Sequence, residues 1–347
     1  MKHTFWQKKS LILPLIFAGI VFAIEKVAGS KFVRKYTETR IEYSFYKQKE
    51  PLLEQLLTQQ KQRKAEDKLL LLSGTSHFGE FSGQYIADKL PGVSTYNFSA
   101  PMASPSFLYY YLEKIIQQGI RVDYAILEAI PEIFQDKANR YAIKFSYDWN
   151  FMLRYSHAFS LRELEAFSSA NLFASIRFPV RFKSILNRIK NPAATLQLEY
   201  MQKLVQLATQ RNNGGIPNPI IHKVSKESLP EEAKHFFATT LAGYQESKTQ
   251  RYFFNRYLQL CKKHNIKVLL LRPLVSQPLE QLIRKEKFYH NWKTKTLQQA
   301  QKYQYPLLEL ESKRKDIKCQ EFVDVHHLSG GCYPEITDIV LAKLKEI

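Results

Sequence analysis

The chain has 347 residues, of which 45% are hydrophobic and 13% aromatic, so it is long and apolar enough to bury a full core. Lys and Arg outnumber Asp and Glu by 51 to 32, and the formal charge of +19 favours an anionic environment, such as phosphate-rich polymers, acidic lipid headgroups or nucleic acid. We find no zinc-ligand spacing, RNA-binding aromatic signature or single basic helix, so nucleic acid is not the expected partner.

Residues 1–34 combine a short basic segment with a signal-like apolar run of 14 residues, Leu11 to Ile24. That length suits a signal-peptide core or a short membrane anchor. Glu25 and Lys26 follow at once and the helical pattern continues, so we expect an uncleaved helix in the membrane over residues 6–27. Secretion after signal cleavage and a buried core helix are the alternatives.

Strands and helices alternate after a polar, helix-prone stretch at residues 35–67, which we expect to form a helical stalk or a first covering helix. Short apolar runs predict strands at 68–74, 93–100, 122–130, 266–273 and 306–310. Helices are expected at 104–119, 251–264, 292–304 and 334–347. This alternation predicts an α/β domain over residues 68–347, with a parallel sheet and helices on both of its faces.

An aromatic-rich region at about 145–250 interrupts this alternation. It is mostly helical in pattern, lacks clear strands and is broken by the loop RNNGGIPNPI at 211–220. An insertion of this size predicts a lid or substrate platform, with a structural cap as the alternative.

The stretch LLLLSGTSHFGE, residues 69–80, ends the first predicted strand in a turn of small and hydroxylic residues. Ligands of open parallel sheets bind beyond the carboxyl ends of the strands. Ser76 would be exposed there, beside helix-start amides that can stabilise an oxyanion. Gly, Ser and Thr also serve purely steric and capping roles in such turns, so Ser76 needs a partner to count as a nucleophile.

A partner for Ser76 stands near the other end of the chain, in EFVDVHHLSGGC, residues 321–332. The D-x-x-H spacing of Asp324 and His327 lets a carboxylate orient an imidazole whose other nitrogen faces a nucleophile. Each motif is common alone, and their conjunction is rarer. Together they predict a catalytic triad of Ser76, His327 and Asp324.

On these residues the chain resembles the SGNH (GDSL-like) hydrolase superfamily, over about residues 68–347 with the helical insertion excepted. Its G-D-S block matches GTSH, with Thr75 in place of Asp, and its D-x-x-H block matches Asp324 and His327. The chain is most similar to the single-pass bacterial envelope branch, which includes the D-alanine transfer protein of teichoic acid synthesis, alginate-type O-acetylation proteins and other SGNH-like membrane proteins. This resemblance implies a flavodoxin-like, three-layer fold and a reaction that needs no metal or organic cofactor.

The two middle blocks of the family differ in this chain. The second block usually supplies a glycine amide to the oxyanion hole, and here Asn97, Ser99 or the amide near Ala100 would have to substitute. The third usually supplies an asparagine, and here Glu128 and Glu132 stand in that region. A carboxylate would repel an oxyanion unless it is protonated or turned away.

Two further residues are candidates for lining the pocket. His77 follows Ser76 directly, and Arg272 ends the fourth predicted strand, where it could bind an anionic substrate group or pair with a neighbouring carboxylate. A metal site made from His77, Asp324, His326 and His327 is the weaker interpretation, because no other residues show ligand spacing.

The three cysteines are too few for a disulfide-rich scaffold. Cys319 and Cys332 bracket the D-x-x-H segment, and an oxidising compartment would permit a disulfide that closes this loop. Cys261 lies on an apolar helical face and is expected in the core.

The expected function is that of a membrane-anchored serine esterase or O-acyltransferase, which moves acyl groups of cell-envelope glycans or lipids. Its partners would be an acyl donor, a glycan or lipid acceptor and an acyl-transfer protein of the membrane. The expected location is the bacterial inner membrane, with the main domain outside the cytoplasm. A non-catalytic envelope binding or scaffold protein, built on the same fold with a lost oxyanion hole, is the alternative.

Overall fold

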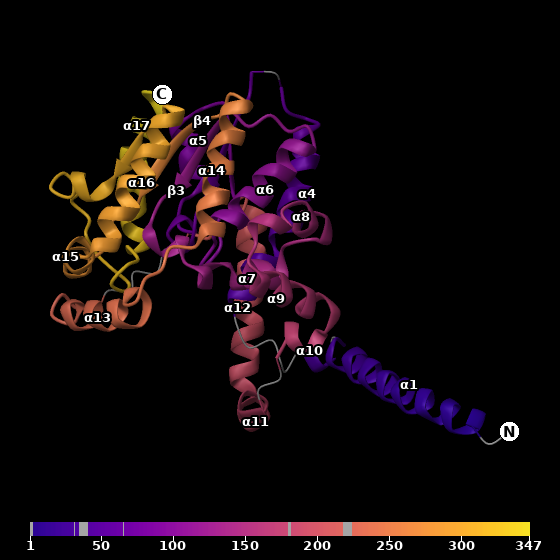
Figure 1. The fold of residues 1–347 in the computed structure, drawn as a ribbon. Helices are drawn as coiled ribbons and strands as arrows, with labels where there is room; N and C mark the ends of the chain where they lie inside the picture. The colour runs from indigo at the N-terminus through magenta and orange to yellow at the C-terminus, as the bar shows by residue number, and fades with distance from the viewer. Residues whose placement is uncertain (1–2, 31, 35–40, 65, 180–181, 218–223) are drawn as a thin grey trace.

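The computed structural model describes residues 3–347 apart from 31, 35–40, 65, 180–181 and 218–223. In this part of the chain, five strands form one parallel sheet in the order β2-β1-β3-β4-β5 (Figure 1). The strands are β1 (Lys68–Ser73), β2 (Val93–Asn97), β3 (Tyr124–Glu128), β4 (Lys267–Arg272) and β5 (Leu307–Glu309). The predicted α/β class with a parallel sheet is confirmed.

Apolar residues explain why these segments form central strands. Leu69, Leu70, Leu71 and Leu72 of β1 are all buried, as expected for a parallel strand covered by helices on both faces. In β1 and β3 the register pairs Ser73 with Leu127, which brings the two strand ends level. The carboxyl end of β1 therefore lies beside that of β3.

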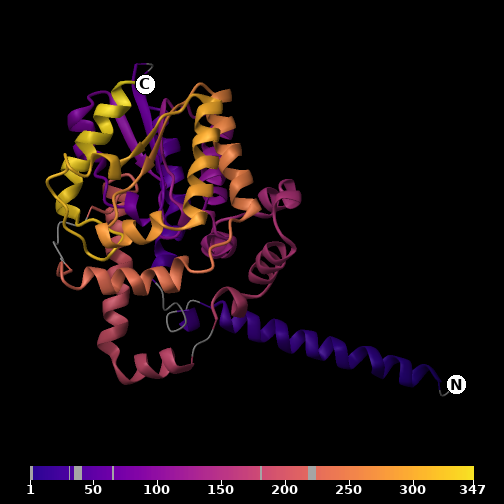
Figure 2. The same ribbon diagram turned by 60° about the vertical axis from the view of Figure 1, so that its left-hand side comes forward.

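Helices cover both faces of the sheet. Helix α14 packs against both α6 and α16, and α5 packs against α17. Because the strand order reverses direction at β1, right-handed crossovers place these two groups on opposite faces, and Figure 2 shows the strands between them. The bounds are α5 (Gly83–Lys89), α6 (Pro105–Gln117), α14 (Lys248–Lys263), α15 (Gln277–Arg284), α16 (Lys287–Tyr303) and α17 (Tyr333–Lys345), with short turns η1 (Ser76–Phe78), η2 (Pro131–Phe134), η3 (Asp136–Asn139), η6 (Leu310–Lys313) and η7 (Gly330–Cys332).

The N-terminal region consists of α1 (His3–Ala28), α3 (Glu42–Lys47) and α4 (Lys49–Gln60). Figures 1 and 2 both show α1 projecting from the body of the molecule. Of the predicted stalk at 35–67, residues 35–40 and 65 lie outside the described residues, and α4 buries Leu52, Leu53 and Leu56 in the main core. Within the described ranges, no helix is both long and apolar enough to cross a membrane.

The described part of the region predicted as an insertion consists of helices joined by turns and loops, without strands. After α7 (Arg140–Phe145) it contains α8 (Trp149–Arg154), η4 (Ser156–Ala158), α9 (Leu161–Leu172), α10 (Ala174–Arg177), α11 (Phe182–Lys190), α12 (Pro192–Arg211), α13 (Leu229–Phe236) and the π-helical turn η5 (Phe237–Leu241). Of the predicted loop at 211–220, the last three residues lie outside the described residues. The first part of this loop docks on the end of β2.

Backbone hydrogen bonds fix that docking. The Asn97 N–H donates to the carbonyl of Asn213 at 2.7 Å, and the Ile216 N–H donates to the carbonyl of Gly79 at 2.7 Å. Gly214, between them, has φ +94°, and a Cβ atom there would overlap the carbonyl oxygen of Asn97. The loop can therefore approach this close only with glycine at position 214.

We expect Gly214→Ala to lower the free energy of unfolding by about 2–4 kcal/mol, because it combines an unfavourable φ with a steric overlap. Gly92→Ala is the matched control, since Gly92 also has a positive φ (+80°) but nothing within 4 Å of its Cβ position; it should cost about 1 kcal/mol. Urea denaturation of the full chain measures both. Equal losses would mean that the loop does not pack against β2 in this way.

Candidate functional site

The turn after β1 presents Ser76 at the carboxyl end of the sheet. Ser76 is the first residue of η1, and no side chain caps the start of this helical turn. Gly74 makes the turn possible, because a Cβ there would lie 2.6 Å from Cγ of Phe78 and 2.7 Å from Oε2 of Glu128. Glycine at position 74 thus allows the close approach of the Phe78 and Glu128 side chains.

The loop before α17 carries the D-x-x-H motif in a folded-back conformation. Phe322 and Leu328 form an antiparallel bridge, and Cys319 is joined to Cys332 by a disulfide with Cα atoms 5.2 Å apart. Inside the loop, Oδ1 of Asp324 accepts hydrogen bonds from the backbone N–H groups of the next two histidines, at 2.9 and 2.8 Å. The carboxylate therefore shapes the turn on which the imidazoles sit.

The structure brings the three residues of the predicted triad together. Ser76 Oγ lies 2.7 Å from Nε2 of His327, and Nδ1 of His327 lies 2.8 Å from Oδ2 of Asp324. Because a carboxylate only accepts, we assign the ring proton to Nδ1, which leaves Nε2 to accept from the serine hydroxyl. This is the arrangement that a serine nucleophile and its general base require.

The surroundings of His327 keep its imidazole neutral. Burial and the neighbouring His326 together lower the pKa of His327 to about 4, although the hydrogen bond to Asp324 acts in the opposite direction. Burial raises the pKa of Asp324, but its hydrogen bonds with the two imidazoles outweigh this and hold it well below its usual range. At 42% side-chain exposure, Asp324 is also partly solvated. At neutral pH the pair is thus a neutral imidazole beside a carboxylate.

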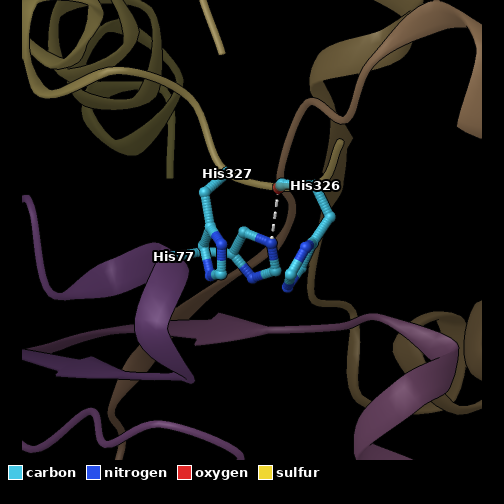
Figure 3. A group of neighbouring side chains, drawn as sticks. All are labelled: His77, His326 and His327. Carbon is cyan, nitrogen blue, oxygen red and sulfur yellow. Dashed lines mark hydrogen bonds between the residues drawn. The ribbon is translucent and has the colours of Figure 1, made fainter. Parts of the chain in front are cut away.

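A second histidine, His77, pairs with a carboxylate and stabilises the turn that carries Ser76. Nε2 of His77 donates to the backbone carbonyl of His326 at 2.8 Å, the bond drawn in Figure 3. Nδ1 of His77 lies 2.7 Å from Oε1 of Glu128 and 2.9 Å from Oγ1 of Thr75. Glu128, which is 0% exposed, also accepts from the Thr75 backbone N–H. Burial lowers the pKa of His77, but the Glu128 carboxylate prevails and raises it.

The rings of His77, His326 and His327 gather closely enough to suggest a metal site, since one nitrogen from each lies within 4.8 Å of the others (Figure 3). A zinc ion would need bonds of about 2.0–2.1 Å to each nitrogen. Both nitrogens of His77 and both of His327 already lie within hydrogen-bond distance of other groups. These residues therefore fit a hydrogen-bonded site better than a metal centre.

Two residues proposed for the oxyanion hole brace the turn. Asn97 and Ser99 are both buried. Nδ2 of Asn97 donates to the carbonyl of Phe78 at 2.6 Å, and its Oδ1 accepts from the Ser99 N–H at 3.0 Å. The amide of Asn97 thus links the end of β2 to the turn that carries Ser76.

Arg272 lies at the end of β4, where its guanidinium forms two hydrogen bonds with Glu280, at 3.0 and 2.5 Å. It also lies over the ring of Tyr289, with 5.0 Å to the ring centroid. This pair is buried. Of the two roles considered for Arg272, the structure places it in the ion pair with a neighbouring carboxylate.

The insertion, for which the sequence predicts a lid or substrate platform, contributes residues to a pocket beside the motif. A pocket of about 620 Å³ lies next to the triad, and its lining residues are Ser228, Glu231, Glu232, His235, Phe236, Thr239, Asp324, Val325 and His326. Within it, the ring of Phe236 from α13 stacks on the ring of His326, with centroids 4.5 Å apart. Helix α13 therefore covers one side of the candidate site.

We expect Glu128→Gln to lower the pKa of His77, because burial would then be opposed only by the weaker effects of Glu132 and of the hydrogen bond with the His326 carbonyl. In the unchanged protein the raised pKa of His77 contributes stability that is full below about pH 6.5 and is lost as the pH rises through the folded-state value. NMR titration of the histidine rings measures this, with the exposed Glu231→Gln as control. An unchanged pKa of His77 would contradict the pairing.

Comparison with known families gives one assignment. Residues 5–344 match the model of a family described as "Protein of unknown function (DUF1574)". A search for relatives among curated proteins finds no match. Since the match spans nearly the whole chain, from α1 to α17, the protein belongs to the DUF1574 family.

Proposed function

We propose that the protein is a serine esterase or O-acyltransferase of the SGNH type that acts on acyl groups of cell-envelope glycans or lipids. The observation that carries this proposal is the unbroken line of hydrogen bonds from Ser76 through His327 to Asp324. The three residues come from segments about 250 positions apart in the chain, and each has the orientation that its role requires.

In the proposed mechanism, Ser76 Oγ attacks the carbonyl carbon of an ester while its proton moves to Nε2 of His327. Asp324 holds the imidazole in the correct tautomer and stabilises the imidazolium that forms. The tetrahedral intermediate then expels the alcohol, which takes the proton from Nε2, and leaves an acyl-serine. Water, or a hydroxyl of the acceptor, then gives its proton to Nε2 of His327 and attacks the acyl carbon. This second tetrahedral intermediate expels Ser76 Oγ, which takes the proton back from Nε2, and the acid or the new ester is released.

The strand order supports the SGNH type. The order 2-1-3-4-5 is that of flavodoxin-like sheets, whose ligands bind where the order reverses, beyond the carboxyl ends of β1 and β3. Ser76 follows β1 and Glu128 ends β3, so the candidate site occupies this position. The resemblance to the envelope branch of the superfamily suggests the substrate class.

A membrane location is part of the same proposal. The described side chains of α1 include exposed apolar residues all along the helix, among them Leu13, Phe17, Ile20 and Phe22. Apolar side chains around a projecting helix favour an apolar surrounding over water. We propose that residues 6–27 hold the protein in the bacterial inner membrane, with the main domain outside the cytoplasm.

A second candidate, a non-catalytic envelope binding protein on the same fold, is favoured by the middle blocks. Nδ2 of Asn97 already donates to the carbonyl of Phe78, and Glu128 is an acceptor in place of the family's asparagine. An oxyanion would then depend on backbone amides of the turn at Ser76. Losing one donor of an oxyanion hole costs about 10²–10³ in rate.

Labelling with a fluorophosphonate probe separates the two candidates. In the full chain, purified in detergent, we expect the probe on Ser76, with no label in Ser76→Ala and a rate at least about 10³-fold lower in His327→Ala and Asp324→Asn. His264→Ala, which changes an exposed histidine at the end of α14, is the control and should label normally. A folded wild-type protein without label at Ser76 would refute the activated serine and favour the binding protein.

The pH dependence of labelling reports on the base. Because the pKa of His327 is lowered to about 4, the rate should stay level through pH 6.5 and fall only as the pH drops through about 4. The rate of labelling measured between pH 3.5 and 8, with circular dichroism to verify the fold at each pH, tests this. A midpoint near 6.5 would show that the base lacks the buried surroundings described above.

A further inference from the structure

Helix α11 presents an apolar stripe to solvent. Phe182, Leu186 and Ile189 are 77, 55 and 63% exposed, and their spacing of four and three residues places them on one face of the helix. Lys183 and Lys190 are also exposed and lie beside this stripe. An exposed apolar stripe flanked by lysines is the pattern of helices that lie in the interface of a membrane.

Helix α12 continues the pattern. Leu196, Tyr200 and Leu204 are exposed at intervals of four residues, again on one face. Helices α11 and α12 contact each other and lie at a steep angle to one another, and this α11–α12 pair projects from the body in Figures 1 and 2. Contiguous apolar surface of this extent on a protruding element marks an interaction site.

The α11–α12 pair follows α10, which contacts α1. The Glu25 carboxylate of α1 accepts hydrogen bonds from the backbone N–H and the hydroxyl of Ser175, which belongs to α10, at 3.0 and 2.5 Å. Helix α10 ends at Arg177 and α11 starts at Phe182. If α1 lies in a bilayer, the first residues of α11 therefore lie near that bilayer's surface.

The charge of the segment fits an anionic surface. Between residues 177 and 204 its acidic residue is Glu199, and its basic residues are Arg177, Arg181, Lys183, Arg188, Lys190 and Lys203. Basic side chains near a bilayer are attracted to anionic headgroups, and the attraction adds to the burial of apolar side chains.

We propose that the α11–α12 pair is a second membrane-contacting element, which inserts its apolar stripes among anionic lipid headgroups beside α1. This inference rests on the proposed membrane location of α1 and is independent of the chemistry at Ser76. With two contacts on the bilayer, the body would be held in one orientation. Helix α12 is followed by the loop at Gly214, which is bonded to the end of β2. This orientation would therefore set how the candidate site faces the membrane.

Spin labels at single cysteines test the proposal in the full chain. The native cysteines do not interfere, because Cys319 and Cys332 form a disulfide and Cys261 is buried. Labels replace Phe182 or Ile189 on the apolar stripe, and Asn187 on the polar face is the matched control. The chain is placed in nanodiscs of phosphatidylcholine and phosphatidylglycerol, one chain per disc, with Phe17→Cys in α1 as the reference for lipid.

We expect labels at Phe182→Cys and Ile189→Cys to collide more with oxygen and less with a water-soluble nickel chelate than the label at Asn187→Cys. Lys183→Glu with Lys190→Glu should reduce this protection from nickel. Nickel access at all three α11 positions, with Phe17→Cys in lipid, would overturn the inference and leave α1 as an anchor. Nickel access at Phe17→Cys as well would overturn both membrane proposals, without bearing on Ser76. Protection that needs two chains per disc would assign the stripe to a second copy instead.

Discussion

The burial of one carboxylate organises the candidate site. Glu128 has no exposed surface, and a buried carboxylate is tolerated only where donors compensate it. Its donors come from the turn after β1, through the Thr75 N–H and Nδ1 of His77. The other nitrogen of His77 holds the carbonyl of His326, next to the base. Satisfying Glu128 thus fixes both the turn that carries Ser76 and the loop that carries His327.

Much of this could be predicted from local patterns. The strands follow from apolar runs, although the strand predicted at 93–100 ends at Asn97, where the side chain begins to bond the turn after β1. Ser76, Asp324 and His327 can be predicted because the end of an apolar strand and a D-x-x-H motif can both be recognised in the sequence. That they meet at 2.7 and 2.8 Å depends on the strand order, which the pattern of strands and helices only restricts to a few topologies.

Other features depend on tertiary contacts that no local pattern reveals. The role of Glu128 follows from the register of β1 with β3, and a shift of one residue would point its side chain to the other face. Arg272 is engaged by Glu280, and either role was open to it in the sequence. The stacking of Phe236 on His326 joins the insertion to the motif although the two residues are far apart in the sequence.

The disulfide between Cys319 and Cys332 has a consequence for the dynamics of the site. It closes a short loop that contains both Asp324 and His327, so the two ends of this loop cannot separate when the surrounding structure opens locally. Asp324 and His327 therefore stay together in one covalently closed unit when the structure around them opens locally.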